Sequence, residues 1–127
     1  MQQRDNSIRL FREKGWTFSK LASKFDISVE RARQICLMED NTKKPGELKK
    51  EIERQYKERL VSKMDYQWLQ SEIKTLAKRD RTQQNVIRRQ MLITYLHDKM
   101  FFSFFSIARL LNRHHTSIKS LYDIEII

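Results

Sequence analysis

Two short apolar stripes at helical spacing stand close together in the first third of the chain. The first consists of Phe18, Leu21, Ala22 and Phe25, and the second of Ala32, Ile35 and Cys36. Intervals of three and four residues place each set on one face of a helix. Asp26 and Ile27 supply a turn between the stripes, and Ser28 is a good N-cap for the second helix. The pattern predicts a helix, a tight turn and a second helix.

A comparable pattern recurs near the end of the chain. One helix is predicted from the stripe Ile87, Met91, Leu92, Tyr95 and Leu96, and the next from Phe104, Ile107, Ala108 and Leu111. The turn Asn112-Arg113 follows, and the final predicted helix, over residues 114–122, has a polar outer face. The sequence therefore predicts a second helix-turn-helix arrangement.

The stretch between these two patterns is predicted to be a helical connector that begins at Pro45-Gly46. A long charged helix is expected from the apolar positions Leu48, Ile52, Tyr56, Leu60, Val61 and Met64. Asp65 is expected to cap the next helix, whose stripe is Tyr66, Leu69, Ile73, Leu76 and Ala77. Such stripes pack within one chain more often than between chains, and a homodimer through residues 46–79 is the alternative.

Composition agrees with an all-α protein assembled from these parts. With 2 Gly and 1 Pro in 127 residues there is little turn chemistry for β-hairpins, whereas good helix formers abound. We expect one helix-turn-helix module over residues 1–42, the connector over 43–80 and the second module over 81–127.

Lys and Arg total 26 against 16 Asp and Glu, a formal net charge of +10. This basic balance favours a polyanionic partner such as nucleic acid.

Several functional classes are excluded by what the sequence lacks. The single Cys36 cannot form an internal disulfide, which fits a reducing cytoplasm and an expected nucleoid-associated location. No apolar run approaches the roughly 18 to 20 residues that a membrane span needs. His114 and His115 are adjacent, so they point in different directions from a helix and make a poor metal site. Without a glycine-rich phosphate loop or a nucleophile beside a base, we expect no cofactor, no metal and no enzymatic activity.

The polar face of the second predicted helix carries side chains suited to reading base edges, namely Glu30, Arg31, Arg33 and Gln34. Arginine pairs with guanine, glutamine with adenine, and glutamate accepts from the cytosine amino group. Residues 25–35, Phe-Asp-Ile-Ser-Val-Glu-Arg-Ala-Arg-Gln-Ile, resemble region four of bacterial housekeeping sigma factors. The resemblance implies that Glu30, Arg33 and Gln34 face bases in the major groove, with Ser28 and Arg31 on or near phosphate.

A second resemblance covers residues 81–122. Arg89-Gln90-Met91 and residues 113–118, Arg-His-His-Thr-Ser-Ile, resemble the C-terminal DNA-binding domain of the bacterial replication initiator DnaA. The resemblance implies major-groove contacts by His115, Thr116 and Ser117, and Lys119 is a further expected DNA contact on the same helix. It also implies Arg81 in the minor groove, with Arg89 and Gln90 on the DNA backbone. His114 replaces the family's aspartate, which removes a good helix cap.

Together these patterns predict sequence-specific binding of double-stranded DNA by two helix-turn-helix modules. The protein is expected to regulate transcription or to bind a replication or maintenance site, for instance on a phage or another mobile element. The alternative is an interaction factor that mimics a sigma factor or an initiator and binds RNA polymerase or a replication protein.

Overall fold

Every regular element in the described part of the chain, residues 2–38, 44–77 and 83–124 of the computed structural model, is a helix. The elements are α1 (Gln2–Glu13), α2 (Phe18–Phe25), α3 (Val29–Leu37), α4 (Pro45–Lys57), α5 (Lys63–Leu76), α6 (Gln83–Thr94), the π-helical η1 (Tyr95–Lys99), α7 (Phe104–Leu111) and α8 (His115–Asp123). Within these ranges there is no strand, and the predicted all-α class is confirmed.

The first helix pair, α2 and α3, begins and ends where its local sequence predicts. The Thr17 hydroxyl accepts a hydrogen bond from the Lys20 amide at 3.1 Å and so caps α2. Asp26 ends the helix in the left-handed conformation, with φ of 54°. Ser28 then caps α3 by accepting from the Arg31 amide at 3.0 Å. These contacts lie within a few residues of one another, which is why sequence alone locates them.

The second helix pair, α7 and α8, repeats the first pair position by position. Ser103 caps α7 as Thr17 caps α2, and Asn112 ends it with φ of 55°, close to that of Asp26. His114 occupies the cap position of Ser28, and its Nδ1 accepts from the Thr116 amide at 3.3 Å. The first helix has 8 residues and the second has 9 in both pairs. The expectation that His114 removes a helix cap is therefore wrong, because the imidazole supplies one.

Helix α1 was not predicted, and it completes the first helix pair. Ile8 is fully buried, and α1 packs against both α2 and α3. The side chain of Arg9 donates from Nε to the carbonyl oxygen of Ile35 at 3.1 Å, near the end of α3. Helix α1 is short and has few apolar residues. Its sequence therefore shows little helical periodicity, although one of its faces is buried.

The connector contains two shorter helices where one long helix followed by another was predicted. Helix α4 ends at Lys57, and the backbone turns at Arg59, whose φ is 64°. Ser62 rather than Asp65 caps α5, since the Ser62 hydroxyl accepts from the Asp65 amide at 3.1 Å. Met64 falls in the first turn of α5 and is 80 % exposed, so it does not belong to the stripe assigned to it.

The buried side of α6 also differs from the predicted stripe. Ile87 and Met91 are 55 % and 56 % exposed, whereas Leu92 and Ile93 are fully buried. Helix α6 packs against both α5 and α8, so its buried surface must face two neighbours rather than follow one stripe. The π-helical turn that begins at Tyr95 further shifts the positions that point inward.

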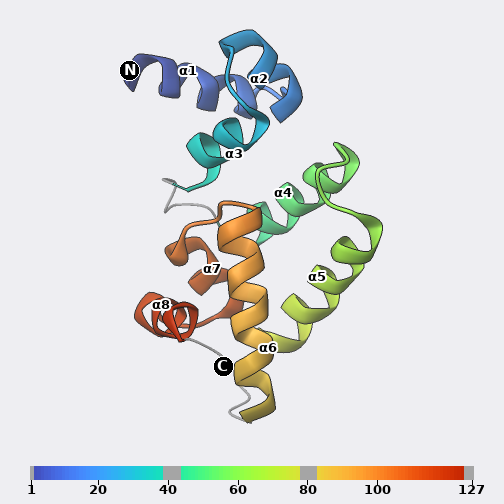
Figure 1. Cartoon of the computed structure of the whole chain (residues 1–127), viewed down its shortest axis with the longest axis vertical. Coiled ribbons are helices and arrows are strands. Elements are labelled where there is room, and N and C mark those ends of the chain that lie inside the picture. Colours follow the sequence, from blue (N-terminus) through green and yellow to red (C-terminus); the bar gives the residue numbers. More distant parts are fainter. Residues whose placement is uncertain (1, 39–43, 78–82, 125–127) are drawn as a thin grey trace.

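One hydrophobic cluster of buried side chains runs through the whole described structure. Helix α4 packs against α7, and α5 packs against α6 and α7, so the connector lies against the second helix pair. Figure 1 shows α1, α2 and α3 at one end of the long axis, with α7 and α8 beside α6 further along it. The apolar stripes of α4 and α5 are buried within the chain, at Leu48, Ile52, Leu69, Ile73 and Leu76.

None of the described helices has the length and apolar character needed to cross a membrane.

Candidate nucleic-acid interface

The outer face of α3 presents three of the predicted base-reading side chains to solvent. Glu30 and Arg31 are exposed and Gln34 is half-buried. The Arg31 guanidinium donates to the Gln34 side-chain carbonyl at 3.0 Å, which orients both groups on the same side of the helix. Ser28 is exposed at the start of the helix, with its hydroxyl engaged in capping. The face therefore combines a cation, an anion and an amide within one and a half turns.

Arg33 does not lie on this outer face, in contrast to the expectation from its sequence position. It is 9 % exposed and its Nη2 donates to the carbonyl oxygen of Lys99 at the end of η1. Its guanidinium lies 5.6 Å from the centre of the Phe101 ring, and burial lowers its pKa. The long side chain turns toward the η1 segment, whose last residue supplies the carbonyl acceptor. In this conformation Arg33 links α3 to the second half of the chain.

The outer face of α8 carries the predicted readers of the second helix pair. Thr116, Ser117 and Lys119 are exposed. His115 is half-buried and stacks on the Phe105 ring, with the two ring centres 4.4 Å apart. Lys119 lies 3.6 Å from Asp123, an exposed pair one turn apart. An exposed pair of this kind contributes little to stability, so the ammonium group remains available to an external anion.

Two further residues predicted to contact DNA, Arg89 and Gln90, lie elsewhere. Arg89 and Gln90 are 7 % and 8 % exposed, and Gln90 donates from its side-chain nitrogen to the carbonyl oxygen of Ile124. Both belong to the buried side of α6, because that helix is covered by α5 and α8. The structure thus corrects their expected placement on an open surface. Arg81 lies outside the described residues.

A lysine and aromatic cluster on α1, α2 and the segment between them was missed by the sequence reasoning. The ammonium of Lys20 lies 4.3 Å from the centre of the Trp16 ring, and that of Lys24 lies 5.6 Å from the centre of the Phe11 ring. Lys14 lies 5.7 Å from the centre of the same Phe11 ring. Among the described residues, none of these lysines has a carboxylate within ion-pair distance. The spacing of Lys20 and Lys24 by one helical turn was the available signal.

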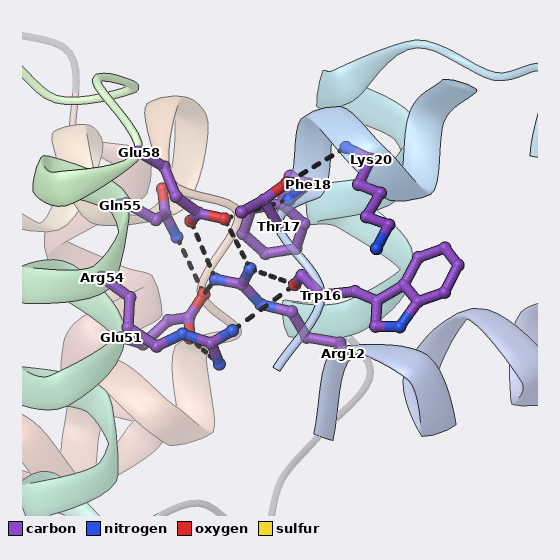
Figure 2. A network of polar contacts seen from close by, with 9 residues as sticks. All are labelled: Arg12, Trp16, Thr17, Phe18, Lys20, Glu51, Arg54, Gln55 and Glu58. Atoms are coloured by element: carbon purple, nitrogen blue, oxygen red, sulfur yellow. Dashed lines mark hydrogen bonds and ion pairs between the residues drawn. The ribbon is translucent and has the colours of Figure 1, made fainter. Parts of the chain in front are cut away.

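A buried ion-pair network joins the first helix pair to α4, and Figure 2 shows it closely. Arg12, 4 % exposed, donates from Nη2 to Glu51 at 2.6 Å and from Nη1 to Glu58 at 2.8 Å. The same Nη1 donates to the carbonyl oxygen of Trp16 at 2.8 Å. The guanidinium also lies 3.6 Å from the centre of the Phe18 ring. Ion pairs, a hydrogen bond to a backbone carbonyl and a cation–π contact therefore hold a single side chain.

Glu58 connects this network to the start of α2. Its Oε1 accepts a hydrogen bond from the backbone amide of Phe18 at 3.1 Å, in addition to its contact with Arg12. Although burial acts to lower the pKa of Arg12, the contacts with Glu58 and Glu51 outweigh it and the pKa is raised. In Figure 2 the ring of Trp16 and the side chain of Lys20 lie on the side away from these carboxylates. The network is thus a buried connection between α1, α2 and α4, while the lysine cluster faces outward.

A polar cleft between α3 and η1 is lined by several titratable side chains. It is lined by Glu30, Leu60, Asp65, Tyr95, Asp98 and Phe101 together with the linking residues Arg33 and Lys99. The Tyr95 hydroxyl donates to Asp65 at 3.0 Å, and burial together with this hydrogen bond raises the pKa of Tyr95 to about 12. Among the described residues, no group of three or more His, Cys, Asp or Glu side chains is arranged to hold a metal ion.

Comparison of the chain with models of protein families, with characterised proteins and with solved structures returned no match.

Proposed function

We propose that this protein binds double-stranded DNA in a sequence-specific manner, with α3 and α8 each entering a major groove. The observation that carries the proposal is the repetition of one helix-turn-helix geometry, with matching caps and a polar outer face on the second helix of each pair. In proteins of this architecture the second helix reads base edges while the first crosses the phosphate backbone. The formal net charge of +10 favours the same partner.

The roles of individual side chains follow from their exposure. Arg31 and Gln34 suit guanine and adenine, and Glu30 suits the cytosine amino group. On α8, Thr116 and Ser117 suit base edges, and Lys119 suits phosphate. Arg33, Arg89 and Gln90 act as supports behind these faces rather than as first contacts, because their polar groups are buried.

Backbone contacts are assigned to the lysine and aromatic cluster, formed by Lys14, Lys20 and Lys24 with Phe11 and Trp16. It spans α1, α2 and the segment between them, and α2 is the helix expected to cross the phosphates. Each phosphate that a cation neutralises contributes about 0.9 to the negative log-log slope of affinity against salt concentration. Neutral substitutions at two of these lysines should therefore lower the slope by up to about 2.

We assign the protein to the regulation of transcription or to a replication or maintenance site, acting without enzymatic activity in the cytoplasm at the nucleoid. A second candidate function is binding to RNA polymerase or a replication protein. It is supported by the apolar groove beside Trp68 and Tyr95, whose rim includes the exposed Met91. The two functions differ in salt dependence, because apolar capture of a protein is much less sensitive to salt than phosphate binding.

The experiment that tests the first candidate is selection from a random duplex library. We would compare the intact chain with the double variants Arg31→Ala/Gln34→Ala and Thr116→Ala/Ser117→Ala, and with the exposed control Gln67→Ala on α5. The expected result is a motif in two parts, of which each double variant loses a different part while the control keeps both. Absence of any motif at low salt, with retained binding to a partner protein, would favour the second candidate.

A further inference from the structure

We infer that Arg12 is a positioning residue that fixes the separation and rotation of the two half-motifs in the DNA site. This inference rests on the proposed function, since it concerns how the two candidate recognition helices are held relative to each other. It assigns Arg12 no direct contact with DNA, because its guanidinium is enclosed by Glu51, Glu58 and the Phe18 ring.

Arg12 joins three helices, α1, α2 and α4, at one point. It belongs to α1, its carboxylate partners Glu51 and Glu58 lie on or directly after α4, and Glu58 also holds the first amide of α2. Side chains of the Arg12–Glu51 pair are 5 % and 7 % exposed. Removing one partner from such a buried pair leaves an uncompensated charge, so the paired arrangement is strongly preferred over a loosened one.

Packed helices connect this ion-pair network to the other candidate recognition helix, α8. Helix α4 packs against α7, and α7 packs against α8. Arg33 adds a separate link, since it reaches from α3 to the carbonyl oxygen of Lys99 at the end of η1. The orientation of α3 relative to α8 is therefore set by the contacts that Arg12 and Arg33 make with the second half of the chain.

A fixed separation of α3 and α8 restricts the DNA sites that the protein can recognise. Two modules on a loose connection tolerate a range of half-site spacings, because each spacing only changes the effective concentration of the second module. Two rigidly held modules accept only the spacing at which both helices meet a major groove on the correct side of the duplex. The Arg12 network thus makes binding depend on the spacing of the two half-sites as well as on their sequences.

The test replaces the whole network, so that no buried charge is left alone. The variant Arg12→Met/Glu51→Gln/Glu58→Gln retains an acceptor for the Phe18 amide and removes all three charges. The matched control is Lys57→Met/Glu53→Gln, which removes an ion pair of 3.3 Å on the same helix that is 72 % and 49 % exposed. Circular dichroism and a cooperative thermal transition would establish that both variants are folded before DNA is added.

Selection from a random duplex library is then applied to the intact chain and to both variants. We expect the intact chain and the control to enrich two half-motifs at one spacing, and the network variant to enrich the same half-motifs at several spacings. Affinity of the network variant for the single-spacing site should fall by about tenfold, with affinity for isolated half-sites unchanged. Retention of the single spacing by the folded network variant would overturn the inference, whereas failure of the intact chain to enrich any motif would overturn the proposed function.

A measurement without DNA tests the structural half of the inference separately. Spin labels at Ser23→Cys and Ser120→Cys, both exposed positions on α2 and α8, would be introduced into the full chain with Cys36→Ala. A single narrow distance is expected in the otherwise native protein and in the control, and a broad distribution in the network variant. A broad distribution in the otherwise native protein, or an unchanged narrow one in the network variant, would contradict the assigned role of Arg12.

Discussion

Nη2 of Arg12 lies 2.6 Å from Oε1 of Glu51, and both side chains are more than nine-tenths buried. The pair brings together residues 39 positions apart in the chain, and the neighbouring contact with Glu58 spans 46 positions. Because the guanidinium is withdrawn from water, its ion pairs cannot be replaced by hydration when one partner is removed.

Substitution of Arg12 alone should therefore destabilise the protein strongly. We expect Arg12→Met to lower the free energy of unfolding by about 3 to 5 kcal/mol, because two buried carboxylates lose their cation. Lys57→Met, in the exposed pair with Glu53, should change it by less than about 1 kcal/mol. Urea denaturation followed by circular dichroism measures both. Equal and small effects from the two substitutions would show that the Arg12 network is solvated in solution.

Ala22 should tolerate no larger side chain, because it lies on the buried face of α2 with Phe18 and Leu21 and is 8 % exposed. We expect Ala22→Leu to lower the free energy of unfolding by about 1 to 3 kcal/mol through overpacking. Ser23→Leu, at the adjacent exposed position, is the control and should have little effect. A fully stable Ala22→Leu variant would mean that this face of α2 is not closely packed against its neighbours.

Arg31 and Arg33 should separate binding from stability, although they are two residues apart on the same helix. Arg31→Ala is expected to reduce discrimination between matched and mismatched duplexes by about 1 to 3 kcal/mol, with the thermal transition unchanged. Arg33→Ala is expected to lower the thermal transition, because its contact with the Lys99 carbonyl is lost. Fluorescence anisotropy and calorimetry on both variants measure the two effects. The reverse assignment would restore Arg33 to the base-reading face.

Tyr95 should make stability fall at alkaline pH. Its pKa is raised to about 12 in the folded chain, above the ordinary value of 10.0, by burial and by the hydrogen bond to Asp65. A group with a raised folded-state pKa contributes stability that is complete below the unfolded value and is lost as pH rises toward the folded one. Between about pH 10 and 12, the free energy of unfolding of the native protein should fall more steeply than that of Tyr95→Phe. Parallel pH profiles for the two proteins would contradict this.

His114 should be open to improvement as a helix cap. Its Nδ1 accepts from the Thr116 amide at the long distance of 3.3 Å, and aspartate is among the best residues for this position. We expect His114→Asp to raise the stability of the protein by about 0.5 to 1 kcal/mol, measured by thermal denaturation, and His114→Ala to lower it. A loss of stability in His114→Asp would indicate that the imidazole has a role that capping does not describe.

The sequence by itself determined the helical class and the limits of the two helix pairs. Asp26 and Asn112 end their helices, and Ser28 begins α3, through contacts within a few residues of each side chain. Such contacts are encoded locally, so a periodic pattern and a capping residue suffice to locate them. The apolar stripe that contains Cys36 likewise predicts its position in the core, and the side chain is buried.

Only the tertiary structure decided which polar side chains face water and which join distant elements. Arg33 follows the buried Ala32 and was expected to point outward, yet it reaches Lys99, 66 positions away. Ile87 belongs to the predicted apolar stripe of α6 and is exposed, whereas Arg89, two residues further along the same helix, is buried. A side chain's partner across the fold depends on how helices pack, and helical periodicity records only the preferences of residues within a turn or two of one another.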